Sequence, residues 1–105
     1  MNKTKKSRLE SAGWKVGDAT EFLELSAEEA AFVDLKLALA LYLRDVRITK
    51  GWTQSRVADL LGSSQSRVAK MEAADASVSL DLLVKALLAL GASREEVGRV
   101  IARAA

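Results

Sequence analysis

From residue 26 onward, apolar residues recur every three or four positions, which is the period of an amphipathic helix. Ser26 followed by Glu29 predicts a capping box at the start of the first helix, and Gly51 is expected to end it in a left-handed conformation. One face of this helix should therefore pack inward. The positions expected on that face are Ala31, Leu35, Leu39, Tyr42, Leu43 and Val46.

Four shorter helical segments follow, and a cap residue marks the start of each. Residues 54–61 follow Thr53 and are closed by Gly62, and residues 65 to about 73 follow Ser64. Residues 80–90 lie between Ser79 and Gly91. Residues 94–104 follow Ser93, which forms a capping box with Glu96. Because the chain contains no proline to interrupt them, the expected fold class is all-α, with five helices.

The segments 54–61 and 65 to about 73 meet at a short turn that contains glycine, which predicts a helix-turn-helix at about 54–73. Ala58 gives a small side chain where two helices must cross closely, and Gly62 can adopt a positive φ without a steric penalty. The inward positions of this unit are Val57, Leu61, Val68 and Met71, and the outward ones are Ser64, Gln65, Ser66, Arg67 and Lys70.

The outward side chains are of the types that contact duplex DNA. In the major groove, a glutamine can bind N6 and N7 of adenine, and an arginine can bind O6 and N7 of guanine. Serine hydroxyls can bond to bases or phosphates, and Gln54, at the start of its helix, can offer its amide to a phosphate. The alternative is that this face is simply solvated on a module that binds protein.

The segment before the first helix has a different pattern. Residues 1–12 are polar and charged and should form a basic arm, for which a DNA contact and no fixed role are equally open. Residues 13–25 alternate in part and predict a short strand or extended segment. We therefore divide the chain into a basic arm and extended segment at 1–25 and a helix-turn-helix DNA-binding domain at 26–105.

Charge is unevenly distributed, although the net charge of the chain is only +2. Residues 1–16 carry +4 and residues 35–70 carry +5, whereas residues 17–34 carry −6. The basic surplus thus coincides with the arm and the helix-turn-helix, as expected for regions that meet phosphates. The acidic block could instead cover a basic protein partner.

The composition excludes several classes of function. The chain has no cysteine and no histidine, so disulfides, thiolate or imidazole metal sites and Ser-His-Asp hydrolysis are not expected. We expect no catalytic residue, metal or cofactor. The basic start is not followed by a long apolar stretch, and the run "VDLKLALALYL" is too short to span a bilayer, so a cytoplasmic protein without membrane contact is expected.

The stretch from Thr53 to Lys70 resembles the Cro/C1-type (XRE) helix-turn-helix repressors. Their pattern of "TQ", a small residue, a glycine and a polar recognition helix is matched by Thr53, Gln54, Ala58, Gly62 and residues 65–70. The resemblance covers about residues 35–90 and implies a lambda-repressor-like domain. It also implies an ion pair between Arg47 and Glu72, with a contact of Arg47 to phosphate or solvent as the alternative. Arg56 departs from the family, which often has glutamate there, and could contact a phosphate in place of a local ion pair.

The surrounding sequence is similar to the HigA-like antitoxins. This similarity implies a sequence-specific transcriptional regulator that represses its own operon and neutralises a RelE-like toxin. Two alternatives are a stand-alone phage-type repressor and a protein-binding module whose main task is toxin capture. In each case double-stranded DNA with a palindromic operator or a partner protein is the expected ligand.

A homodimer is expected, because two recognition helices about 34 Å apart read a palindrome across one turn of DNA. One apolar stripe should supply the core, and a second near the C-terminus could form the dimer seam. The core stripe is Leu80, Leu83, Val84, Leu87 and Leu88, and the seam is Val97, Val100 and Ile101. Trp52 is expected in the core.

Overall fold

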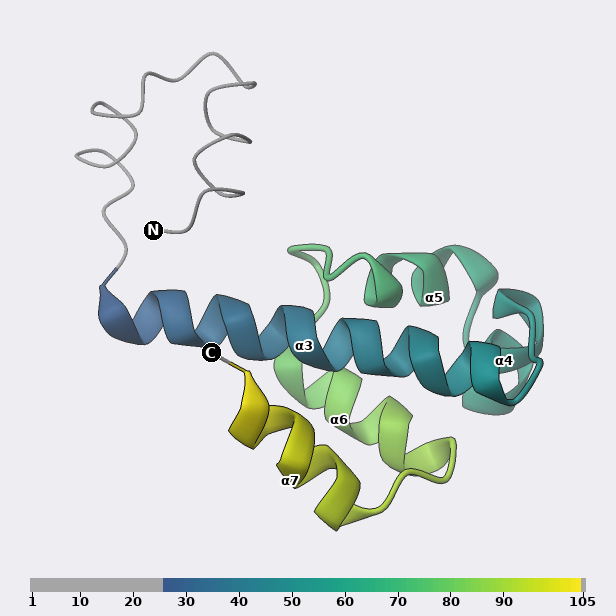
Figure 1. The fold of residues 1–105 in the computed structure, drawn as a ribbon. Helices are drawn as coiled ribbons and strands as arrows, with labels where there is room; N and C mark the ends of the chain where they lie inside the picture. The colour runs from purple at the N-terminus through teal and green to yellow at the C-terminus, as the bar shows by residue number, and fades with distance from the viewer. Residues whose placement is uncertain (1–25, 105) are drawn as a thin grey trace. The chain divides into compact units, whose positions relative to one another are not determined.

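A computed structural model describes residues 26–104, and within them the chain forms five α-helices and no strand, which confirms the all-α prediction. The basic arm and the extended segment predicted at 1–25 lie outside the described residues. The helices, labelled in Figure 1, are α3 (Ala27–Thr49), α4 (Gln54–Leu61), α5 (Gln65–Glu72), α6 (Leu80–Ala89) and α7 (Arg94–Arg103). None of these helices is long and apolar enough to span a membrane.

The helices begin where a hydroxyl side chain can satisfy a free backbone amide. Thr53, Ser64, Ser79 and Ser93 each accept from the amide three residues on, and each such cap contributes about 1 kcal/mol. Ser93 and Glu96 form the full capping box, with the Glu96 carboxylate accepting from the Ser93 amide at 2.9 Å. At Ser26 the hydroxyl accepts from the Glu29 amide at 3.1 Å and meets the Glu29 carboxylate at 3.3 Å.

Four helices end in the same way, with a residue in the left-handed region that lets two amides turn back to helix carbonyls. Gly51, Gly62 and Gly91 have φ of 71°, 64° and 101°. After α5 this position is held by Ala74 at φ 53°, where its amide bonds to Met71 O and the amide of Asp75 bonds to Lys70 O. Because Ala74 carries a Cβ, the end of α5 is strained where the other three are not.

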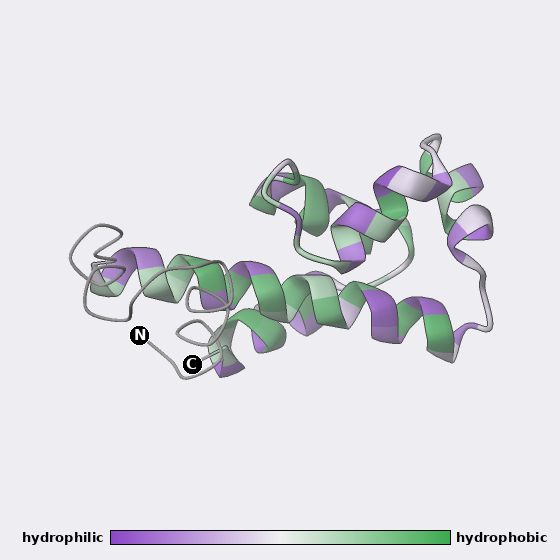
Figure 2. Ribbon diagram, turned by 90° about the horizontal axis from the view of Figure 1, so that it is seen from above, coloured by the Kyte–Doolittle hydropathy of each residue, from purple (hydrophilic) through white to green (hydrophobic). Residues whose placement is uncertain are grey.

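The described residues fall into two units, and the second, Val33–Ala105, contains the hydrophobic core. Within that unit α5 lies on one side of α3, with α6 and α7 on the other (Figure 1). Figure 2 shows apolar residues recurring among hydrophilic ones along α3, as the period of its core-facing positions requires. The fully buried large side chains are Leu39, Leu43, Val57, Val68, Met71, Val78, Leu83 and Leu87.

The predicted packing is wrong at four residues. Ala31 and Leu88 were expected to face inward, yet both are exposed, and the exposed fraction of Leu88 is 41%. Val97, predicted in a dimer seam, is only 6% exposed because α7 packs its apolar face on α6. Val100 also packs against the core, so Ile101 is the one residue of that stripe left exposed. Trp52 is half-buried against the core, with Lys50 Nζ 5.0 Å from its ring centroid.

Polar side chains of α3, and that of Lys50 just after it, bond to the segments around this helix. Tyr42 Oη donates to Glu96 Oε2 on α7 at 3.0 Å, and the chain carbonyls of Asp75 and Leu90 accept from Lys36 and Lys50 at 2.9 and 2.7 Å. Partial burial, and then the hydrogen bond to Glu96, raise the pKa of the Tyr42 phenol. These contacts fix α3 to α7 and to the residues that follow α5 and α6.

Candidate nucleic-acid interface

Helices α4 and α5 form the helix-turn-helix, and apolar contacts fix the angle between them. Ala58 is 3% exposed at the crossing, which leaves no room for a larger side chain there. Val57 on α4 and Val68 and Met71 on α5 are buried beneath them. Since one side of α5 is committed to this packing, its opposite side must face solvent.

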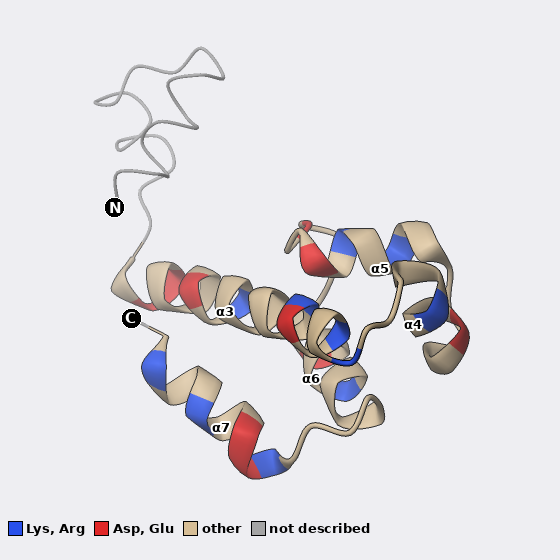
Figure 3. Ribbon diagram, turned by 45° about the vertical axis from the view of Figure 1, so that its right-hand side comes forward, with Lys and Arg blue, Asp and Glu red and all other residues tan. Residues whose placement is uncertain are grey.

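The exposed side of α5 carries all five of the outward residues expected from the sequence. Ser64, Gln65, Ser66, Arg67 and Lys70 are exposed. The Ser64 hydroxyl caps the helix by accepting from the Arg67 amide at 3.2 Å, and it also lies 3.3 Å from the Ser66 hydroxyl. The basic residues on α5, where Figure 3 shows positive charge, are Arg67 and Lys70. This surface has the chemistry of a DNA-reading face.

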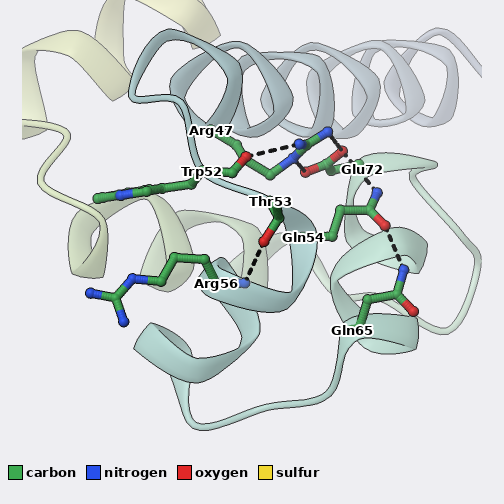
Figure 4. A network of polar contacts seen from close by, with 7 residues as sticks. All are labelled: Arg47, Trp52, Thr53, Gln54, Arg56, Gln65 and Glu72. Atoms are coloured by element: carbon green, nitrogen blue, oxygen red, sulfur yellow. Dashed lines mark hydrogen bonds and ion pairs between the residues drawn. The ribbon is translucent and has the colours of Figure 1, made fainter.

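An ion pair connects the recognition helix to α3. Arg47 Nε donates to Glu72 Oε2 at 2.6 Å and Arg47 Nη2 donates to Glu72 Oε1 at 3.0 Å, with the two side chains 16% and 6% exposed (Figure 4). Arg47 Nη1 also donates to the Trp52 carbonyl at 3.1 Å. The hydrogen bonds to Glu72 raise the pKa of Arg47, so the guanidinium keeps its charge at every working pH. This two-point contact holds α3 against the end of α5.

The same carboxylate continues into a line of hydrogen bonds that the sequence did not predict. Gln54 Nε2 donates to Glu72 Oε1 at 3.2 Å, and Gln65 Nε2 donates to Gln54 Oε1 at 2.6 Å (Figure 4). We call Arg47, Glu72, Gln54 and Gln65 the polar chain. A spacing of eleven residues between two glutamines carries no signal by itself, because their contact depends on the angle between α4 and α5.

The polar chain has a direction, which follows from the chemistry of its members. The Glu72 carboxylate can only accept, so Gln54 must turn its NH2 group toward it and its oxygen toward α5. That oxygen in turn requires the NH2 group of Gln65. Gln65 is then left with a free Oε1 acceptor and one free N–H, and these are the two groups that bind N6 and N7 of adenine.

Arg56 does not join the other predicted site residues. It is exposed, but Figure 4 shows its side chain directed to the opposite side of α4 from Gln54 and Gln65. Gln54, expected to be free for a phosphate, is half-buried and already holds two partners. Within the described residues no group of three or more acidic, His or Cys side chains is placed to hold a metal ion.

Comparison with known proteins gives one match. The family model described as Helix-turn-helix matches residues 43–97, a range that includes α4, α5 and α6 and the pair Arg47 and Glu72. Neither the curated proteins nor the solved structures include one that matches the chain.

Proposed function

The chain belongs to the Cro/C1-type helix-turn-helix (XRE) family of DNA-binding transcriptional regulators, and from this premise we propose that it is a sequence-specific repressor that reads its operator with α5. The observation that carries the proposal is the exposed polar face of α5, held rigidly by the buried contacts of α4 and by the polar chain. A base-reading side chain discriminates only when its orientation is fixed before binding.

In this function each outward residue has a defined role. Gln65 reads adenine through the oxygen and N–H that the polar chain leaves free. Arg67 reads guanine or a phosphate, while Lys70 and the hydroxyls of Ser64 and Ser66 contact the DNA backbone. Gln54 acts mainly by orienting Gln65, and Arg56 reaches a phosphate only on the other flank of α4.

The length of α5 favours binding as a homodimer. Its eight residues span about 12 Å, or about four base pairs of duplex, which is too short to define an operator. Two copies related by a twofold axis would read a palindrome with half-sites about 34 Å apart. Analytical ultracentrifugation with and without the palindrome tests this expectation, and a single copy on each duplex would contradict it.

Selection of bound sequences from random duplexes, followed by anisotropy titrations, tests the DNA-reading proposal. Gln65→Ala and Arg67→Ala should each weaken binding to the selected duplex by about 1–3 kcal/mol and relax preference at one base position. Arg94→Ala on α7 serves as the control, because it removes the same charge from an exposed position on another helix. Parental affinity in both α5 variants would show that α5 is not the reading helix.

A second proposed function is toxin neutralisation, as in an antitoxin that also represses its own operon. It is favoured by the acidic block 17–34, whose net charge of −6 complements a basic RelE-like toxin. In the part of this block that the structure describes, Glu28 and Glu29 are exposed at the start of α3. Removal of residues 1–25 should abolish capture of such a toxin while leaving the helices folded, and unchanged capture would exclude that segment.

A further inference from the structure

A hollow of about 290 Å³ lies between α3, the first residue of α4 and the recognition helix α5. Its lining residues are Arg44, Arg47, Gln54, Ala69, Glu72 and Ala73. It therefore adjoins the DNA-reading face on the side of the polar chain. Arg44 is the charged member of this set that neither the sequence pattern nor the family resemblance singled out.

The hollow has one uncompensated positive charge. Arg47 and Glu72 neutralise each other as an ion pair, and Gln54 donates one further hydrogen bond to the Glu72 carboxylate. Arg44 is exposed, and among the described residues it has no hydrogen-bond or ion-pair partner. An exposed guanidinium in a hollow whose other charges cancel favours a single anion.

The walls of the hollow are shaped for the backbone of a duplex. Besides Glu72, the side formed by α5 and its C-cap carries Ala69 and Ala73, which are one turn apart and have the smallest side chains that still carry a Cβ. Such a wall permits the close approach of a bulky sugar-phosphate chain. The N-terminus of α4 opens at Gln54, and its free backbone amides and helix dipole also favour an anion.

We propose that this hollow holds one backbone phosphate of the operator and that Arg44 is the side chain that binds it. The inference rests on the proposed function, because the phosphate belongs to the duplex that α5 enters. A contact here clamps the backbone between α3 and the recognition helix. Arg44 therefore sets affinity and register, and it carries no base specificity.

The experiment compares Arg44→Ala with Arg94→Ala in full-length protein, using the selected duplex at several salt concentrations. Loss of one phosphate contact should lower the slope of log affinity against log salt by about 0.9 per bound copy in Arg44→Ala and leave it unchanged in Arg94→Ala. The ratio of specific to non-specific affinity should stay at the parental value in both. Arg44→Lys keeps the charge and should keep the slope.

A second measurement identifies the phosphate itself. Duplexes with a neutral methylphosphonate at one position at a time should reveal a position that weakens binding of the parent and has no further effect on Arg44→Ala. Circular dichroism checks that Arg44→Ala is folded, and Arg44→Gln replaces it if it is not.

The outcomes separate this inference from the proposed function. If the parent binds no duplex, or if Gln65→Ala and Arg67→Ala bind as the parent does, the DNA-reading proposal itself fails. If those variants are weakened but Arg44→Ala keeps the parental slope and responds to every methylphosphonate as the parent does, only the Arg44 site is refuted. A lowered slope together with altered base preference would also refute it, since a phosphate contact cannot change which bases are read.

Discussion

Replacement of Glu72 by glutamine tests the energetics of the polar chain most directly. The substitution preserves the size and shape of the side chain but removes the charge that faces Arg47. The Arg47 side chain is 16% exposed. Its guanidinium would then keep only neutral acceptors, which are the Trp52 carbonyl and the amide oxygen of the new glutamine. A nearly buried cation is left without its counter-charge.

The expected loss of stability can be estimated from this burial. Breaking a buried ion pair by neutralising one partner costs about 3–5 kcal/mol. The residual exposure of Arg47 and its bond to the Trp52 carbonyl place Glu72→Gln at the lower end, about 3 kcal/mol. The free energy of unfolding of small domains is about 5–15 kcal/mol, so the variant should remain folded but melt about 12–24 °C below the parent.

Urea unfolding followed by circular dichroism measures this loss, with Glu95→Gln as the matched control. Glu95 is an exposed glutamate in the first turn of α7, where the same substitution should cost about 0.5 kcal/mol through the helix dipole alone. The double variant Arg47→Met, Glu72→Leu should regain much of the loss, because no unpaired charge is left buried.

A loss below about 1 kcal/mol for Glu72→Gln would refute the reasoning, since it would mean that water already solvates Arg47 in the folded protein. The same variant has a second readout in DNA binding. With an amide at 72, either end of Gln54 can face it, so the orientation of Gln65 is no longer fixed. Discrimination for adenine at the position that Gln65 reads should decrease in the surviving folded protein.

Two further predictions concern stability. Ala74→Gly should raise the free energy of unfolding by about 0.5–1 kcal/mol, because glycine adopts a positive φ without strain. Ala73→Gly, at φ −86°, should lower the free energy of unfolding. The reverse order of the two urea midpoints would contradict this reasoning. The amide and hydroxyl of Ser93, and then the Tyr42 hydroxyl, hold the pKa of Glu96 below its usual 4.5. The contribution of the Glu96 carboxylate to folding stability is therefore complete above pH 4.5, and it is lost as the pH falls through the lower pKa of the folded state. The stability difference between parent and Glu96→Gln should therefore shrink in acid, and a gap that widens below pH 4.5 would show that the sign is wrong.

The helix boundaries could be predicted from the sequence because their causes are local. Thr53 and Ser64 bond to amides three residues away, and Gly51 and Gly62 take the positive φ that a neighbouring residue would resist. The exception shows the limit of such signals. Nothing in the sequence marks Ala74 as left-handed, since alanine does so only when packing and two returning amide bonds compel it.

Polar contacts between helices could be predicted only where a family resemblance supplied them, whereas the buried positions of α4 and α5 followed from the helix-turn-helix pattern. The pair Arg47 and Glu72 was expected from that resemblance, whereas the contact of Gln54 with Gln65 depends on the angle between α4 and α5. Val97 was misplaced for the same reason, because periodicity identifies an apolar face but not the surface that it meets. The sequence did not single out Arg44, because one arginine among the exposed positions of a helix forms no pattern that indicates a site.

The polar chain also decides which positions can be exchanged independently when the operator preference is redesigned. Ser66, Arg67 and Lys70 contribute no bond to it, so a library that randomises them keeps the scaffold intact while its members diverge in the duplexes they select. Gln65 differs, because any residue that replaces it must donate a hydrogen bond to Oε1 of Gln54. Codons 54 and 65 therefore have to be varied as a pair, and new specificities at that base should emerge only from pairwise libraries.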